Sequence, residues 1–218
     1  MINTSKLLDL DHSIAKEYFL GFEMPWQILT SLKEVILNLQ QKLDKEEFDE
    51  VSHQVFIHKS VKIAPNAYIG GPAIIGKNTE IRQSAFIRGV ALIGENCVIG
   101  NSTEIKNSVL FDNVEVPHFN YVGDSILGYS SHMGAGAICS NVKSDKSNVV
   151  VHDGEVEILT KLEKFGCILG DHSEVGCNSV LNPGTIIGRN SIIYPLSSVR
   201  GVIPSDVIFK NDGLVKRV

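Results

Sequence analysis

The fold is decided by residues 63–110, which read IAPNAYIGGPAIIGKNTEIRQSAFIRGVALIGENCVIGNSTEIKNSVL. Isoleucine occupies every sixth position: Ile63, Ile69, Ile75, Ile81, Ile87, Ile93, Ile99 and Ile105. Four places after each stands a small or β-branched residue: Ala67, Ala73, Thr79, Ala85, Ala91, Cys97, Thr103 and Val109. A period of six fits neither the 3.6-residue turn of a helix nor the two-residue alternation of a strand. It is typical of a parallel β-helix, in which each six-residue unit forms one flat side and three units close one coil.

The repeat weakens in the middle of the chain and then returns. Near Phe111 the spacing shortens, so two units are expected to contain five residues. Residues 140–167 leave the period, and a hairpin is expected there around Asp153 and Gly154. Regular spacing resumes with a second row of aliphatic residues: Leu169, Val175, Leu181, Ile187, Ile193 and Val199. A loop that leaves a solenoid is usually functional, so we expect site residues near this excursion.

The chain divides into a helical segment, residues 1–52, and a β-helix domain, residues 53–218. From Pro25 onward, aliphatic residues fall on one face of a predicted helix of about five turns: Ile28, Leu29, Leu32, Val35, Ile36, Leu39 and Leu43. This face is expected to pack on the first coils or on a neighbouring subunit. The acidic run from Asp44 to Glu50 is predicted to be a solvated linker.

Composition argues against several classes of partner. The 218 residues carry a formal charge of -5 and a pI near 5.8, which disfavours nucleic acid and anionic membrane surfaces. The amino terminus lacks the features of a secretory signal, and no apolar run approaches the roughly 18 residues of a membrane span. A cytoplasmic protein is therefore expected. The four cysteines lack CxxC spacing, so no zinc knuckle is indicated.

Two cations are predicted to stack on the outside of the coils. Arg88 and Lys106 are separated by one coil of three units, and each follows a core isoleucine. Their separation would be about 4.8 Å, the spacing of neighbouring strands. At an effective dielectric constant near 20, two such charges repel by roughly 3 kcal/mol. A bound phosphate would relieve that repulsion; the alternative is two separately solvated surface cations.

His118 lies where the period is disturbed, and a histidine takes up a proton from an amine near neutral pH. The surrounding residues 86–141 contain the elements E-x-K-N-S (104–108), H-x-x-Y-x-G-D (118–124) and G-A-G-x-I-x-x-N (134–141), and Arg88 stands where an R-P-G element begins. This segment resembles the acetyltransferase half of the bifunctional N-acetylglucosamine-1-phosphate uridylyltransferase and its archaeal sugar-1-phosphate relatives. The likeness covers about residues 63–205. It implies a left-handed β-helix homotrimer with active sites between subunits, which transfers acetyl from acetyl-CoA to the amine of glucosamine 1-phosphate or galactosamine 1-phosphate.

The resemblance also implies roles for individual residues. His118 corresponds to the general base, and the contacts to the sugar phosphate would come from Arg88, Lys106, Tyr121, His132 and Asn141. The contacts to acetyl-CoA would come from Ala135, Cys177, Pro195 and Arg200. The backbone N–H groups of the turn 134–136 are expected to bind the thioester oxygen as it gains negative charge. No metal is expected for this transfer.

Several positions depart from the family pattern. Gly89 replaces the proline of the proline-glycine pair, and His132 stands where the bacterial enzymes have an asparagine. The usual tyrosine-aspartate-glycine after Asn141 is missing, which makes Lys143 or Lys146 an additional candidate for a phosphate. No glycine-rich nucleotide-binding loop of the LxAGxGT type is present, so uridylyl transfer is not expected.

Three other functions compete with this interpretation. The first is acetylation of another acceptor, such as a nucleotide-linked aminosugar, an antibiotic or a hydroxyl. The second is a zinc carbonic anhydrase on a similar β-helix; it needs three histidines, and only His53 and His58 are suitably close in sequence. The third is a non-catalytic scaffold or regulatory subunit, which the retention of His118, Tyr121 and Asn141 disfavours.

Overall fold

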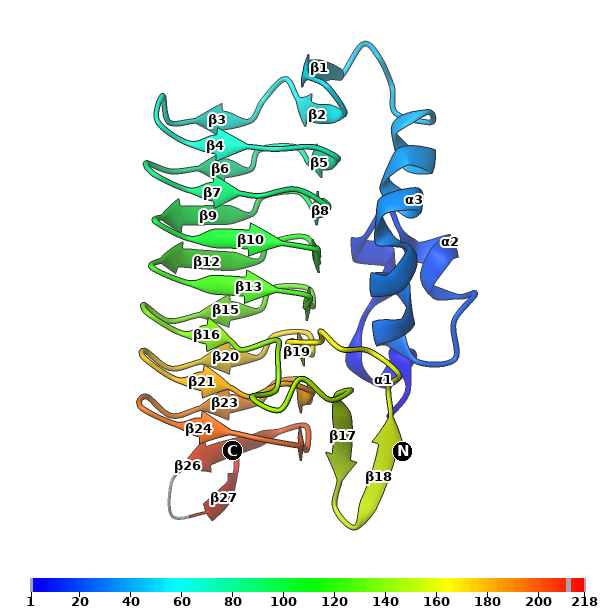
Figure 1. Ribbon diagram of the computed structural model, residues 1–218. Coiled ribbons are helices and arrows are strands. Elements are labelled where there is room, and N and C mark those ends of the chain that lie inside the picture. The colour runs from blue at the N-terminus through cyan, green and yellow to red at the C-terminus, as the bar shows by residue number, and fades with distance from the viewer. Residues whose placement is uncertain (1, 211–212, 218) are drawn as a thin grey trace.

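The structure is a computed structural model that describes residues 2–210 and 213–217. Short strands follow one another around three flat faces, and most pair in parallel with strands one coil before and one coil after (Figure 1). The predicted parallel β-helix of hexapeptide coils is confirmed. Within the described residues, no helix is long and apolar enough to cross a membrane.

The three faces are hydrogen-bonded sheets, numbered here in the order in which the chain visits them. Face 1 contains β1 (Phe48–Ser52), β2 (Val55–His58), β5 (Ala73–Ile75), β8 (Ala91–Ile93), β11 (Ser108–Leu110), β14 (Ile126–Leu127), β19 (Cys167–Leu169), β22 (Thr185–Ile187) and β25 (Val202–Ile203). Face 2 contains β3 (Lys62–Ile63), β6 (Glu80–Ile81), β9 (Val98–Asn101), β12 (Glu115–His118), β15 (His132–Met133), β20 (Glu174–Val175), β23 (Ile192–Ile193), β26 (Val207–Lys210) and β27 (Gly213–Lys216). Face 3 contains β4 (Tyr68–Ile69), β7 (Phe86–Ile87), β10 (Glu104–Lys106), β13 (Tyr121–Gly123), β16 (Ile138–Cys139), β21 (Val180–Leu181) and β24 (Ser198–Val199).

The isoleucine row forms the core of the coils. From Ile75 to Ile105 these side chains are at most 1% exposed, whereas Ile63, at the open end of the stack, is 42% exposed. Each fully buried aliphatic side chain contributes roughly 1.5–3 kcal/mol of transfer free energy. The repeat therefore specifies both the register of the coils and most of their stability.

The first shortened unit lies next to Phe111, as the sequence predicted. Leu110, not Phe111, pairs with Ile93, so the five-residue unit runs from Ile105 to Leu110. Phe111 is displaced from the row and packs against Phe19, with ring centroids 5.5 Å apart. The other short unit ends at Leu127. Both units lose their residue at the same corner, where face 3 turns into face 1.

The amino-terminal segment covers face 1. It contains α1 (Thr4–Leu7), the 3-10 turn η1 (Leu10–His12), α2 (Lys16–Phe19), η2 (Pro25–Gln27) and α3 (Ile28–Gln40), and α3 stands beside the stack of coils (Figure 1). The outward positions of face 1 that it meets are all apolar: Phe56, Ile74, Leu92, Val109, Ile126, Ile168, Ile186 and Val202. The expected apolar face of α3 is buried from Ile28 to Leu39. The contacts reach well beyond the first coils, because Trp26 packs on Phe165, with ring centroids 5.6 Å apart.

Three other segments complete the fold. The expected hairpin is present, formed by β17 (Val150–Asp153) and β18 (Val156–Leu159). At the carboxyl end, β26 and β27 form a second hairpin on face 2. The expected linker at 44–50 is partly wrong: β1 begins at Phe48 and pairs antiparallel with β2, because its backbone completes the open edge of face 1.

Candidate functional site

One corner of the solenoid carries His118 and three of the predicted cofactor contacts. His118 ends β12 and pairs with Asn101 of the coil before. The register of the following coils places Ala135, Cys177 and Pro195 in the same row, one per coil. We call this row, at the turn from face 2 to face 3, the His118 column. His118 and Cys177 are exposed, and no described residue hydrogen-bonds the imidazole of His118.

The turn at Gly134, Ala135 and Gly136 has fewer free backbone N–H groups for a ligand than the sequence analysis expected. The N–H of Gly134 donates to the Val175 carbonyl at 2.7 Å, and the N–H of Gly136 donates to the His118 carbonyl at 3.0 Å. These bonds hold neighbouring coils together, so two of the three expected oxyanion donors are already used. Only the N–H of Ala135 has no acceptor among residues 2–210 and 213–217.

The neighbouring corner, where face 3 turns into face 1, carries the two predicted cations. Arg88 and Lys106 occupy one row, which we call the Arg88 column, as the eighteen-residue spacing predicted. Each cation has its own carboxylate: Arg88 Nη1 lies 3.0 Å from Glu104 Oε1, and Lys106 Nζ lies 3.0 Å from Asp124 Oδ2. The expected unrelieved repulsion is therefore absent. The site is a neutral cluster of two cations and two carboxylates.

Asp124 is the centre of this cluster. Its side chain is 5% exposed, and its backbone lies in the left-handed region with φ of 49°. Besides the Lys106 ammonium, its carboxylate accepts hydrogen bonds from the side-chain amides of Asn107, at 2.7 Å, and Asn141. Its backbone carbonyl accepts from the N–H of Gly166 at 2.9 Å. Asp124 thus joins three successive coils at the point where the excursion leaves and returns.

Tyr121 links the two corners. A Cβ atom at Gly123 would lie 2.4 Å from the Tyr121 hydroxyl oxygen, so the ring folds along β13 over the bare backbone of Gly123. Burial raises the pKa of Tyr121, and the nearby charges of Asp124 and Glu104 raise it further. The phenol is therefore neutral at physiological pH and available as a hydrogen-bond donor. The nearby side chain of Asn141 acts against this shift of the Tyr121 pKa, which places the hydroxyl close to the Asp124 cluster.

The His118 column and the Asp124 cluster lie at opposite ends of β13. This strand contains three residues, Tyr121–Gly123, and spans about 10 Å at the usual rise of a strand. Both ends are accessible on the outside of the coil. The structure therefore brings Arg88, Lys106, Tyr121 and Asn141 together, and places His118 across one strand from them.

Two predicted residues lie apart from these groups. His132 is half-buried on face 2, in a row between Glu115 and Glu174. Arg200 falls in the Arg88 column, not in the His118 column with the other predicted cofactor contacts. It borders a polar depression that also contains Lys143 and Asn182. Its guanidinium makes no ion pair within the described part of the chain.

The residues described by the structure do not form the three-histidine zinc site that a carbonic anhydrase would need. His58 Nδ1 lies 2.8 Å from the Ser60 hydroxyl, and within residues 2–210 and 213–217 no three potential ligands of the His, Cys, Asp and Glu types converge.

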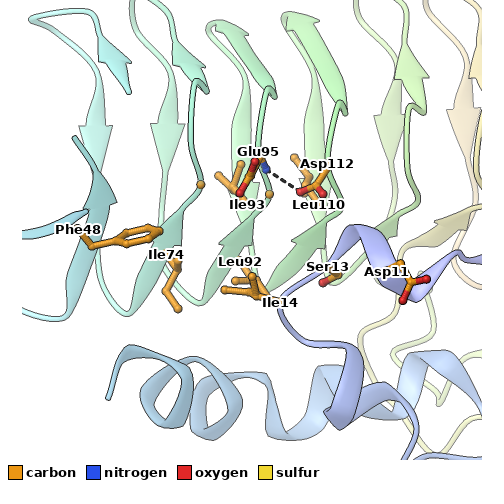
Figure 2. Close-up of a pocket in the computed structure, with 12 residues that line it drawn as sticks. Asp11, Ser13, Ile14, Phe48, Ile74, Leu92, Ile93, Glu95, Leu110 and Asp112 are labelled. Atoms are coloured by element: carbon orange, nitrogen blue, oxygen red, sulfur yellow. Dashed lines mark hydrogen bonds between the residues drawn. The ribbon is translucent and has the colours of Figure 1, made fainter. Parts of the chain in front are cut away.

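A separate cavity of about 190 Å³ lies between the amino-terminal segment and face 1 (Figure 2). Ile14, Phe48, Ile74 and Leu92 form its apolar wall, with carboxylates such as Asp112 at its rim. None of the predicted site residues lines it. The predicted site residues therefore all lie outside this cavity.

Sequence reasoning missed the carboxylates of the site. Asp124 and Glu104 both belong to the motifs that identified their neighbours, H-x-x-Y-x-G-D and E-x-K-N-S. The signal that could have found Asp124 is its position within the second five-residue unit, which runs from Val122 to Leu127.

Two protein families and several named relatives match this chain in sequence. Residues 72–163 match the family described as GMPPB C-terminal domain, and residues 54–89 match the bacterial transferase hexapeptide family (six repeats). The bifunctional protein GlmU of Methanococcus maripaludis is 32% identical over 205 residues, which cover 92% of this chain and 49% of that protein. A bifunctional sugar-1-phosphate nucleotidylyltransferase/acetyltransferase of Sulfurisphaera tokodaii is 30% identical over 211 residues, 94% of this chain and 53% of that protein.

The chain thus spans about half the length of these two relatives. A relative of similar size also matches: the putative uncharacterized acetyltransferase YaiX of Escherichia coli is 31% identical over 184 residues. The match covers 83% of this chain and 80% of YaiX.

Proposed function

The chain belongs to the hexapeptide-repeat acyltransferases, and from this premise we propose that it transfers an acetyl group from acetyl-CoA to the amine of a hexosamine 1-phosphate. One observation carries the proposal. A single short strand, β13, separates an exposed histidine from a cluster of cations, carboxylates and amides. Such an arrangement suits an acceptor that has a phosphate at one end and an amine at the other.

The acceptor would lie along β13. Its phosphate would meet Arg88 and Lys106, its ring would lie beside Tyr121 and Asn141, and its amine would point toward His118. The length of β13, about 10 Å, is comparable to that of a hexose carrying a phosphate. The Tyr121 hydroxyl would serve as a hydrogen-bond donor, because its raised pKa keeps it protonated.

The two cations would act differently on the phosphate. The Arg88 side chain is 52% exposed, and an exposed ion pair such as Arg88–Glu104 contributes only about 0–1 kcal/mol. A phosphate can therefore recruit the guanidinium from Glu104 at little cost. Lys106 is 21% exposed and is held by the buried Asp124, so it would present an ordered ammonium in a fixed direction.

His118 would act as general base. An aminosugar arrives largely as ammonium and becomes nucleophilic only after losing a proton, which the imidazole accepts near neutral pH. The amine nitrogen then attacks the thioester carbonyl, the C–N bond forms and the C–S bond breaks. The nitrogen loses a second proton as it becomes an amide, and that proton balances the protonation of the departing coenzyme A thiolate. The Ala135 N–H is the backbone donor available to the developing oxyanion.

The acetyl donor would run along the His118 column, past Ala135, Cys177 and Pro195. Both corners lie open on the outside of one chain, so a second copy would be needed to enclose the substrates. We therefore include a homotrimer with sites between subunits in the proposal.

The test is release of free thiol from acetyl-CoA in the presence of glucosamine 1-phosphate or galactosamine 1-phosphate. The unphosphorylated aminosugars serve as matched acceptors. We expect turnover of a phosphorylated acceptor, and we expect the Arg88→Ala, Lys106→Ala double variant to raise its KM without affecting turnover of the unphosphorylated sugar. Absence of turnover with every aminosugar phosphate would refute the proposed function.

A further inference from the structure

Two bulky residues of the His118 corner occupy a backbone conformation that such residues rarely adopt. Six successive coils have a residue with positive φ at this corner: Ser84 (59°), Ser102 (55°), Phe119 (53°), Gly136 (72°), Asn178 (54°) and Leu196 (59°). Glycine and asparagine tolerate the left-handed region, whereas a large side chain is strained in it. Phe119 and Leu196 therefore depart from the pattern of their own corner.

The surrounding structure imposes this conformation. The Phe119 N–H donates to the Asn101 carbonyl at 2.9 Å, and the Leu196 N–H donates to the Cys177 carbonyl at 3.0 Å. The corresponding N–H of Gly136 donates to His118 in the same way. The coil thus fixes the backbone whatever side chain is present, and the choice of Phe and Leu must have another reason.

Burial within the chain does not provide that reason. Phe119 is 60% exposed and Leu196 is 72% exposed. Neither side chain gains the transfer free energy that normally offsets a strained backbone. Strained residues that gain nothing locally tend to occur at functional sites.

Their position in the chain identifies the site. Phe119 directly follows His118, and Leu196 directly follows Pro195, at the two ends of the row expected to contact acetyl-CoA. Three coil steps separate them, about 14 Å at the usual strand spacing. Between them stand Gly136, which has no side chain, and Asn178. The carbonyls of His118, Ala135 and Cys177 are already used between coils, so a ligand here must be recognised largely by side chains.

We propose that Phe119 and Leu196 are the apolar contacts that hold the pantetheine arm of acetyl-CoA against the His118 column. This inference rests on the proposed function and adds the residues that select the donor. The arm is long and thin with apolar stretches, which suits two apolar side chains separated by a gap. Phe119 would lie at the acyl end, next to the base, and Leu196 toward the nucleotide end.

The experiment replaces both residues with the type that the left-handed position favours. In the variant Phe119→Asn, Leu196→Asn, we expect the KM for acetyl-CoA and the Kd for coenzyme A by calorimetry to rise by about tenfold. The acceptor KM and the mass of the assembly should not change. The melting temperature should stay equal or rise, because asparagine relieves the backbone strain. The conservative variant Phe119→Leu, Leu196→Met keeps the apolar surface and should bind the donor like the wild type.

Each other outcome has a clear meaning. Unchanged donor KM in the asparagine variant overturns the inference while the proposed function stands. Dissociation of the assembly, measured by light scattering, overturns it too, because the two residues would then face a second copy of the chain. A wild-type protein that neither binds coenzyme A nor turns over refutes both this inference and the proposed function.

Discussion

The ammonium of Lys106 lies 3.0 Å from Oδ2 of Asp124, whose side chain is 5% exposed, whereas the parallel pair one coil away, Arg88 and Glu104, is 52% and 29% exposed. Two ion pairs of the same type thus lie side by side in different environments. Their response to neutralising substitutions should differ accordingly.

We expect Asp124→Asn to lower the free energy of unfolding by about 2 kcal/mol, somewhat less than the roughly 3–5 kcal/mol typical of a fully buried pair, since Lys106 is 21% exposed. The acceptor KM should also rise, because Lys106 and Asn141 lose their common partner. Urea unfolding and steady-state kinetics measure the two effects. The control is Glu104→Gln, which should cost at most about 1 kcal/mol; equal costs for the two variants would contradict this explanation.

Gly123 is expected to be essential because of Tyr121. In Gly123→Ala, the new Cβ would lie 2.4 Å from the Tyr121 hydroxyl oxygen, so the ring must leave its place along β13. We expect kcat/KM to fall by about tenfold or more, equivalent to at least about 1.4 kcal/mol of transition-state stabilisation. Adding Gly123→Ala to Tyr121→Ala should cause little further loss, because the clash is gone. An additive loss in that double variant would show that the glycine acts independently of the ring.

Cys177 should be the thiol that reacts in the folded protein. It is exposed, whereas Cys97, Cys139 and Cys167 are buried. Burial raises the pKa of Cys97 to about 12, and the hydrogen bond with Cys167, together with burial, raises the pKa of Cys139. We therefore expect N-ethylmaleimide to label one thiol per chain in the native state and four after unfolding. Cys177→Ser should abolish native labelling, and coenzyme A should slow it; labelling unaffected by saturating coenzyme A would argue against a donor path along the His118 column.

The amino-terminal cover should contribute measurably to stability. Leu32 of α3 is fully buried, and truncating a buried leucine to alanine costs roughly 2–5 kcal/mol. Leu20 in the same segment is 63% exposed, so Leu20→Ala should change stability by less than about 0.5 kcal/mol. Thermal and chemical unfolding of both variants provide the comparison. Similar small effects would mean that the segment does not hold face 1 in solution.

Much of the fold could be predicted from the isoleucine row alone, because a period of six leaves few architectures open. The row also predicted correctly that Arg88 would stack over Lys106. It placed the first short unit near Phe111 but did not show whether Leu110 or Phe111 points inward, because both residues are apolar. That choice depends on Phe19, which lies far away in the sequence and packs on Phe111.

The site could be predicted only in part. The motifs identified Lys106, Tyr121 and Asn141, which the structure brings to one cluster. They did not show that Asp124 neutralises Lys106, since the two residues belong to different motifs and lie 18 positions apart in the sequence. They also assigned Arg200 to the cofactor without indicating that it lies in the other column. The uninterrupted row from Leu169 to Val199 contains this information, because Pro195 follows Ile193 on one face and Arg200 follows Val199 on the next.

The position of α3 has a consequence for how the protein unfolds. In a bare solenoid each coil contacts only its neighbours, so coils can fray one at a time from either end. Here one amino-terminal segment touches widely separated coils: Gln40 donates to the carbonyl of Gln54 at 2.8 Å, and the Leu7 carbonyl accepts from the N–H of Asp171 at 3.0 Å. By contacting both early and late coils, this segment, which we call the brace, couples their unfolding. Opening the end coils therefore requires the brace to detach, and the stack should lose its structure in a single transition and not coil by coil.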